Sequence, residues 1–133
     1  MKRTLYFPLL VVAAFTSSHA MAAARHVVKT LPGYSCAMLN LTHEQEMDFN
    51  HPPMLYSEPR DGAQTMGGAA EVLAVKSDTA PVNGYIPALQ MNMKSGWVKQ
   101  ALIKPYAAAA DPTARCEPVL MSDGTQGFSY HHD

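Results

Sequence analysis

The chain has 133 residues, of which 16% are charged, and its net charge is −1 when the histidines are neutral. This length allows one modest hydrophobic core and argues against a second domain. The slightly acidic balance argues against binding to nucleic acid, which requires clustered basic side chains.

Residues 1–24 have the pattern of a secretory signal peptide: two basic residues near the start, an apolar run over residues 5–15, and small residues after it. The apolar run is shorter than the roughly 20 residues that span a bilayer, and no later segment is suited to do so. We therefore expect a periplasmic or secreted chain with no membrane span after cleavage; an uncleaved anchor is the alternative. Cleavage after Ala20, Ala22 or Ala24 satisfies the small-x-small rule, and Ala22 or Ala24 is preferred. Without the leader, eight Lys and Arg residues face eleven Asp and Glu residues, a net charge near −3.

Cys36 and Cys116 both remain after removal of the leader. An exported chain enters a compartment where disulfides persist, so we expect these two residues to pair. Two free thiols or a metal pair are the alternatives, although two isolated cysteines without CxxC spacing make a poor zinc site. A bridge between such distant positions would restrict the unfolded chain by roughly 4 kcal/mol.

Residues 25–53 have an irregular pattern, and we expect an N-terminal extension that lies on the core. Pro32-Gly33 predicts a turn. Thr42, with Gln45 three residues later, has the capping-box pattern and predicts one short helix.

Residues 54–106 contain short strand-like runs separated by turn residues such as Asn83-Gly84. The predicted strands lie within residues 54–59, 69–77, 83–91 and 95–100. Their length and spacing favour a small barrel or sandwich. Residues 107–133 begin with an alanine run, continue through Cys116 to a predicted turn at 122–124, and are expected to form a C-terminal extension held by the disulfide.

The order of motifs over residues 54–106 resembles the bacterial SH3-like domain. The motifs are LYSEP at 55–59, a loop at Gly67-Gly68, EVLAV at 71–75, NGY at 83–85, GWV at 96–98 and ALI at 101–103. The most specific of them is the Gly-Trp-Val strand, followed by a one-turn helix and a final short strand. The resemblance implies a mainly β fold with a small SH3-like barrel. The irregular N- and C-terminal extensions, which we expect to be joined by the disulfide, fall outside the family pattern.

Trp97 is the only tryptophan, and it lies on the Gly-Trp-Val strand. Adjacent strand residues point to opposite faces, so only one of Trp97 and Val98 can be in the core, and the resemblance places Val98 there. Gly96 would let the backbone approach a neighbouring strand. We expect Trp97 to be half-buried at the barrel edge, where it either stabilises the fold or offers a ring face to a ligand. The expected core residues are Val98, Leu102 and Ile103, facing Val72, Leu73 or Val75 and Ile86 or Leu89.

The resemblance implies a non-enzymatic binding module that recognises a cell-wall peptide or a protein partner and needs no cofactor. Lys99 and Leu102 stand where eukaryotic relatives that grip proline-rich helices use a proline and a tyrosine, so polyproline binding is not expected. HEQEM at 43–47 lacks the second histidine of a zinc-protease motif, and no Gly-x-Ser-x-Gly is present. The candidate ligand-binding residues are Tyr56, Arg60, Asp61, Tyr85, Trp97 and Tyr106.

A periplasmic copper-binding protein is the alternative function, since methionine and histidine are suitable copper ligands. Met91 and Met93 would place two sulfurs on one strand face, although methionine is also ordinary core filler. Cleavage after Ala23 would make His26 the third residue, as in a known type of copper(II) site. His131 and His132 are expected to lie in a disordered tail.

Overall fold

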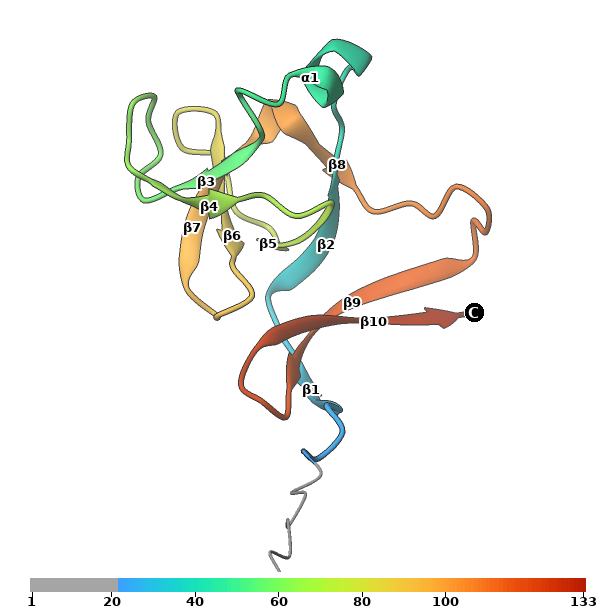
Figure 1. Cartoon of the computed structure of the whole chain (residues 1–133). Helices are drawn as coiled ribbons and strands as arrows, with labels where there is room; N and C mark the ends of the chain where they lie inside the picture. Colours follow the sequence, from blue (N-terminus) through green and yellow to red (C-terminus); the bar gives the residue numbers. More distant parts are fainter. Residues whose placement is uncertain (1–21) are drawn as a thin grey trace, which may run out of the picture.

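The computed structural model describes residues 22–133, and this part of the chain is mainly β, as predicted (Figure 1). The predicted leader lies outside the described residues except for its last three positions. The elements are β1 (Val27–Thr30), β2 (Tyr34–Leu39), α1 (His43–Met47), β3 (Met54–Tyr56), β4 (Thr65–Gly68), β5 (Val72–Lys76), β6 (Tyr85–Leu89), β7 (Ser95–Lys99), the 3₁₀ turn η1 (Gln100–Leu102), β8 (Ile103–Pro105), β9 (Ala114–Met121) and β10 (Gln126–His132).

Seven strands form one antiparallel sheet in the order β4-β3-β7-β6-β5-β2-β8. The strands predicted within residues 54–100 are all present, and the one-turn helix and final short strand follow β7 as expected. However, β2 is an inner strand that pairs with β5 and β8, so the sheet begins at Tyr34 and not at Met54. Cys36 and Ala37 are buried in it, which explains why this segment joins the core and does not merely lie on it.

The hydrogen-bonded order of this sheet is open, with β4 at one end and β8 at the other. Within residues 22–133 no ladder joins these two ends, so the expected closed barrel is not formed. Both edge strands are poorly suited to pairing with a further strand. The register shifts between Leu55 and Tyr56 where β3 meets β4, and β8 ends in Pro105, which has no N–H to donate.

The core lies inside the seven-stranded sheet and confirms most of the predicted core residues. Val98 is fully buried, and it faces Ile86 across the β6–β7 ladder. Leu102 is half-buried and does not belong to the central cluster. That cluster consists of Ala37, Leu55, Leu73, Val75, Ala88 and Val98, with Leu39, Met66, Ala69, Ile86 and Ile103 packed against it.

Gly96 is where β7 comes closest to the β3–β4 hairpin, as expected. A Cβ atom at this position would lie 3.3 Å from the Tyr56 carbonyl oxygen and 3.1 Å from the Met66 sulfur. The absence of a side chain therefore allows β7 to pair beside β3 through Tyr56 and Trp97.

A second sheet has the order β1-β9-β10, and the β9–β10 hairpin forms its larger part. The predicted turn is present: Gly124 has φ of +81°, and its N–H donates to the Met121 carbonyl. The pairing continues to the last residues, where His131 and His132 lie opposite Arg115 and Ala114. The expectation of irregular flanks and of a disordered histidine tail is therefore wrong.

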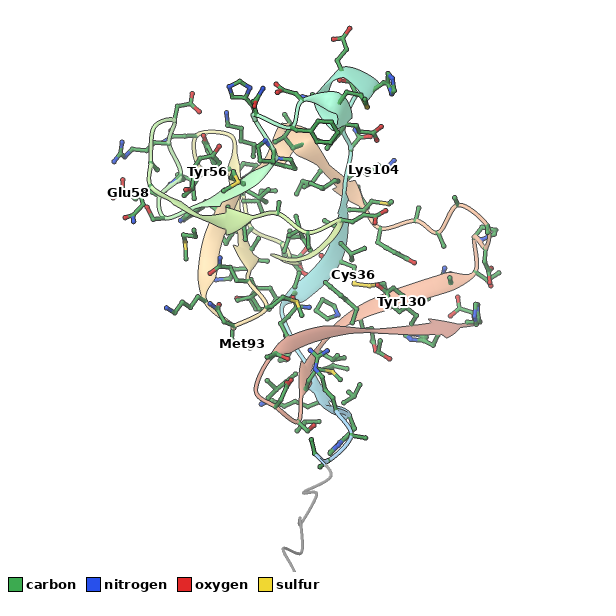
Figure 2. All side chains as sticks on the ribbon, viewed as in Figure 1. Cys36, Tyr56, Glu58, Met93, Lys104 and Tyr130 are labelled. Carbon is green, nitrogen blue, oxygen red and sulfur yellow. A yellow bond between two sulfur atoms is a disulfide. The ribbon has the colours of Figure 1, made fainter. Side chains whose placement is uncertain are left out.

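The predicted disulfide between Cys36 and Cys116 is present, with the two Cα atoms 6.0 Å apart. It connects β2 of the seven-stranded sheet to β9 of the three-stranded sheet (Figure 2). A hydrogen bond also connects the two sheets: the backbone N–H of the buried Gln126 donates to the Met91 carbonyl at 2.8 Å. Among the described residues, no helix has the length and apolar character needed to cross a membrane.

The predicted short helix is also present as α1. The Thr42 hydroxyl accepts the Gln45 N–H at 3.2 Å, and the Thr42 N–H donates to the Gln45 side-chain oxygen at 2.8 Å. This is the expected capping box.

Removal of the disulfide should lower the free energy of unfolding. The two cysteines are 80 positions apart, so the double variant Cys36→Ser, Cys116→Ser should lose about 4 kcal/mol because its unfolded chain is no longer restricted. Urea denaturation of the variant, and of the reduced wild type as a control, measures the loss. An unchanged midpoint in both would contradict a bridge that stabilises the fold.

Substitution of Gly96 should be costly because its neighbours are close. Gly96→Ala should destabilise the chain by about 1–3 kcal/mol, since the backbone oxygen of Tyr56 cannot move freely. Gly68→Ala is the matched control, because a Cβ there meets no atom within 4 Å. Thermal unfolding of both variants checks this, and equal midpoints would show that β7 does not depend on the close approach.

Candidate functional site

Three of the predicted ligand-binding residues lie together on neighbouring strands. Tyr56 on β3 pairs with Trp97 on β7, and Tyr85 lies on β6, the next strand in the sheet. The rings of Tyr56 and Tyr85 meet edge to face with their centres 5.8 Å apart. This is a favourable geometry for aromatic pairs, so the cluster is stabilised by its own contacts.

Tyr85 is a structural member of this cluster, because its residue is only 3% exposed. Its hydroxyl donates to Oδ1 of Asp61 at 2.6 Å, and the Lys99 ammonium lies 3.3 Å from the same oxygen. The hydrogen bonds from Tyr85 and Lys99 and the charge of Lys99 lower the pKa of Asp61. The hydrogen bond to Asp61, with burial and the Asp61 charge, raises the pKa of Tyr85 to about 12. These contacts fix the 57–64 loop against β6 and β7.

Trp97 is half-buried, as predicted, and its neighbours in the ladder are Pro87 and Tyr56. It lines neither of the two grooves described below. Its position is consistent with a stabilising role at the sheet surface.

Tyr56 lines a groove of about 780 Å³ between the 41–54 segment and η1. We call it the Tyr56 groove and define it by Leu41, Asp48, Pro53, Tyr56, Lys99 and Leu102. Figure 2 shows Tyr56 on β3. The lining combines apolar surface with one acid and one base, so a ligand could be held by ring and proline contacts and oriented by charge.

The acidic side of the groove is ordered by a local side-chain contact. Oδ2 of Asp48 lies 2.9 Å from Nδ1 of His51, and both residues line the groove. The hydrogen bond from His51 is the main cause that lowers the pKa of Asp48. The carboxylate is therefore negative at neutral pH.

Two large apolar side chains are exposed beside this groove. Phe49 is 81% exposed and Met47 is 58% exposed, and Phe49 lies between Asp48 and Asn50, both of which line the groove. These side chains add exposed apolar surface to the segment that lines the groove, and contiguous apolar surface of this kind marks interaction sites. Neither residue was predicted, although an apolar residue in an otherwise polar stretch is a signal that the sequence contains.

The other predicted ligand-binding residues lie elsewhere. Arg60 is in the 57–64 loop and pairs with Glu58, outside the Tyr56 groove. Tyr106 lines a second groove near the disulfide, and its ring lies 5.8 Å from that of Tyr130. Of the six predicted residues, Tyr56, Asp61, Tyr85 and Trp97 therefore come together, and Arg60 and Tyr106 do not.

The residues 22–133 hold no group of three or more His, Cys, Asp or Glu side chains placed to bind a metal ion. Met91 and Met93 lie in the turn between β6 and β7, where Met93 has φ of +67° (Figure 2). The prediction that their sulfurs share one strand face is wrong. His132 pairs instead with Asp111, with Nδ1 and Oδ2 2.8 Å apart.

Comparison of the chain with protein-family models, curated proteins and solved structures finds no match.

The bond between Tyr85 and Asp61 can be tested by titration. Because the pKa of Tyr85 is raised to about 12, the folded state is stabilised at pH values below about 10, the ordinary phenol pKa. This stabilisation is lost as the pH rises through the folded-state pKa. The tyrosinate absorbance of the wild type should show one phenol that ionises near 12.

In Asp61→Asn that late ionisation should move towards 10, because the amide carries no charge to oppose tyrosinate. Glu117→Gln removes an exposed carboxylate elsewhere and should leave the titration unchanged. If all phenols of the wild type ionise near 10, the bond is absent.

Proposed function

We propose that this chain is a non-enzymatic binding module, and that it holds a peptide segment in the Tyr56 groove. The single observation that carries this proposal is the exposure of Phe49 beside a groove lined by Tyr56 and two prolines, Pro52 and Pro53. Rings and prolines offer rigid apolar contact area at low entropic cost.

The charges of the groove favour a peptide over a purely apolar ligand. Lys99, which also contacts Asp61, and Asp48, which contacts His51, both line the groove, so side chains of opposite charge lie along a single bound chain. A peptide carries both an N–H and a C=O at each residue and can also offer charged side chains. The apolar surface then supplies affinity, and the charges select orientation.

We also propose that residues 34–105 are SH3-like. Support comes from the element order, in which β5, β6 and β7 follow one another before η1 and the short β8, and β2 lies between β5 and β8. This architectural proposal is separate from the peptide-binding function.

An exported location fits the module. The disulfide requires an oxidising compartment to persist, which is the condition of the periplasm and of secreted proteins. The partner is then a peptide of the cell wall or of another exported protein.

The function is tested by selecting binding peptides from a random phage-displayed library against the oxidised chain and measuring their affinity by fluorescence anisotropy. Phe49→Ala should weaken binding by about tenfold or more, as is typical of aromatic anchors. Its thermal midpoint should stay close to the wild-type value because an 81% exposed side chain contributes little to the core.

Val82→Ala is the matched control, since Val82 is an exposed apolar residue outside the Tyr56 groove. Cosedimentation with purified peptidoglycan sacculi tests whether the ligand is a cell-wall peptide. If the wild type binds the sacculi and Phe49→Ala does not, the ligand belongs to the cell wall. The function is refuted if no selected peptide saturates and sacculi are not bound, or if both variants lose binding equally.

A further inference from the structure

A second groove, of about 590 Å³, lies between the seven-stranded sheet and the start of β9. We call it the Tyr106 groove, and its defining residues are Ile86, Ile103, Lys104, Tyr106, Ala108 and Arg115. Both cysteines of the disulfide belong to its wall, so the bridge that joins the two sheets also shapes the groove. Its volume lies within the range of small-molecule sites.

This groove is separate from the Tyr56 groove. The turn η1 divides them: Gln100 lines the Tyr106 groove, whereas Ala101 and Leu102 line the Tyr56 groove. In Figure 2, Lys104 lies on β8 and Tyr56 lies on β3, at different sides of the sheet. A ligand in one groove therefore does not occupy the other.

The charges of the Tyr106 groove have one sign. Lys104 and Arg115 line it, and none of its lining residues is Asp or Glu. Arg115 is already occupied, because one terminal nitrogen lies 2.6 Å from Asp133 and the other donates to the Pro112 carbonyl at 3.2 Å. Lys104 forms no ion pair with any residue between 22 and 133.

The apolar part of the lining is held in place from both sheets. Ile103 packs against the buried core cluster. The ring of Tyr106 lies against that of Tyr130, so the hairpin supports it. The 107–113 loop, which includes Ala108, is tied to the end of β10 by the contact between Asp111 and His132. The groove is thus a shaped apolar surface with one free cation at its side.

From this charge complementarity we propose that the Tyr106 groove binds a small molecule with an apolar body and a single carboxylate, and that the carboxylate pairs with Lys104. An apolar floor takes the body, while an unpaired ammonium takes the charge. The proposal does not depend on peptide binding in the Tyr56 groove.

The test uses two matched fluorescent probes on the oxidised full chain: anilinonaphthalene sulfonate, which is anionic, and phenylnaphthylamine, which has the same rings without the charge. The anionic probe should bind saturably at one equivalent. In Lys104→Glu its affinity should fall by about tenfold or more, while that of the neutral probe changes less than twofold. Octanoate should displace the anionic probe, and octanol at the same concentration should displace it less.

Three control variants test whether the probes bind in the Tyr106 groove. Lys94→Glu makes the same charge change at an exposed lysine outside the groove and should leave both probes bound. Ala108→Phe should weaken both probes by filling the groove, and Phe49→Ala should affect neither. The proposal is overturned if the anionic probe does not bind saturably, or if octanoate and octanol displace it equally. It is also overturned if Lys94→Glu and Lys104→Glu lose equal affinity, if Ala108→Phe binds both probes unchanged, or if Phe49→Ala loses either probe.

Discussion

The covalent bond between Cys36 and Cys116 is the constraint on which the arrangement of the two sheets depends. Within residues 22–133 the seven-stranded and three-stranded sheets share no backbone ladder. They are connected by the bridge, by the hydrogen bond from Gln126 to Met91, by the contact between the rings of Tyr106 and Tyr130, and by the 31–33 turn between β1 and β2. A single hydrogen bond contributes only about 1 kcal/mol net, whereas the bridge is a covalent cross-link between strands that are distant in the sequence.

The two grooves depend on this arrangement to different degrees. The Tyr56 groove is built within the larger sheet, from β3, η1 and the segment that precedes β3. The Tyr106 groove is built from both sheets and contains the disulfide in its wall, so it exists only while β9 is held beside β2. Reduction of the bridge should therefore affect the second groove first, whereas the Tyr85–Asp61–Lys99 contacts involve neither β2 nor β9.

Part of this fold could be predicted from the sequence because its signals are local. An Asn-Gly turn, the alternation around Val72 and Val75, the capping box at Thr42 and the Gly-Trp-Val strand each require only a few consecutive residues. The disulfide could be predicted because a chain with two cysteines has only one possible intramolecular pair.

The remainder depends on partners that are distant in the sequence. The role of β2 as an inner strand follows from pairing with β8, whose residues come much later in the chain. Met91-Asn92-Met93 alternates like a strand but forms a turn, since the N–H of Met93 bonds to the Gln90 carbonyl. The candidate site also depends on residues that are distant in the sequence. Tyr56 and Tyr85 meet because their strands are close in the sheet, whereas Tyr106 follows β8 and lies near the disulfide.

The central claim is that Cys36 is bonded to Cys116, and mass spectrometry of a non-reducing tryptic digest tests it most directly. Cleavage after Lys29, Arg60 and Arg115 separates the two cysteines onto peptides 30–60 and 116–133. The structure predicts that these peptides are recovered as one linked species, which splits into two on reduction. Recovery of the two peptides separately, with both cysteines alkylated before any reductant is added, would contradict the account.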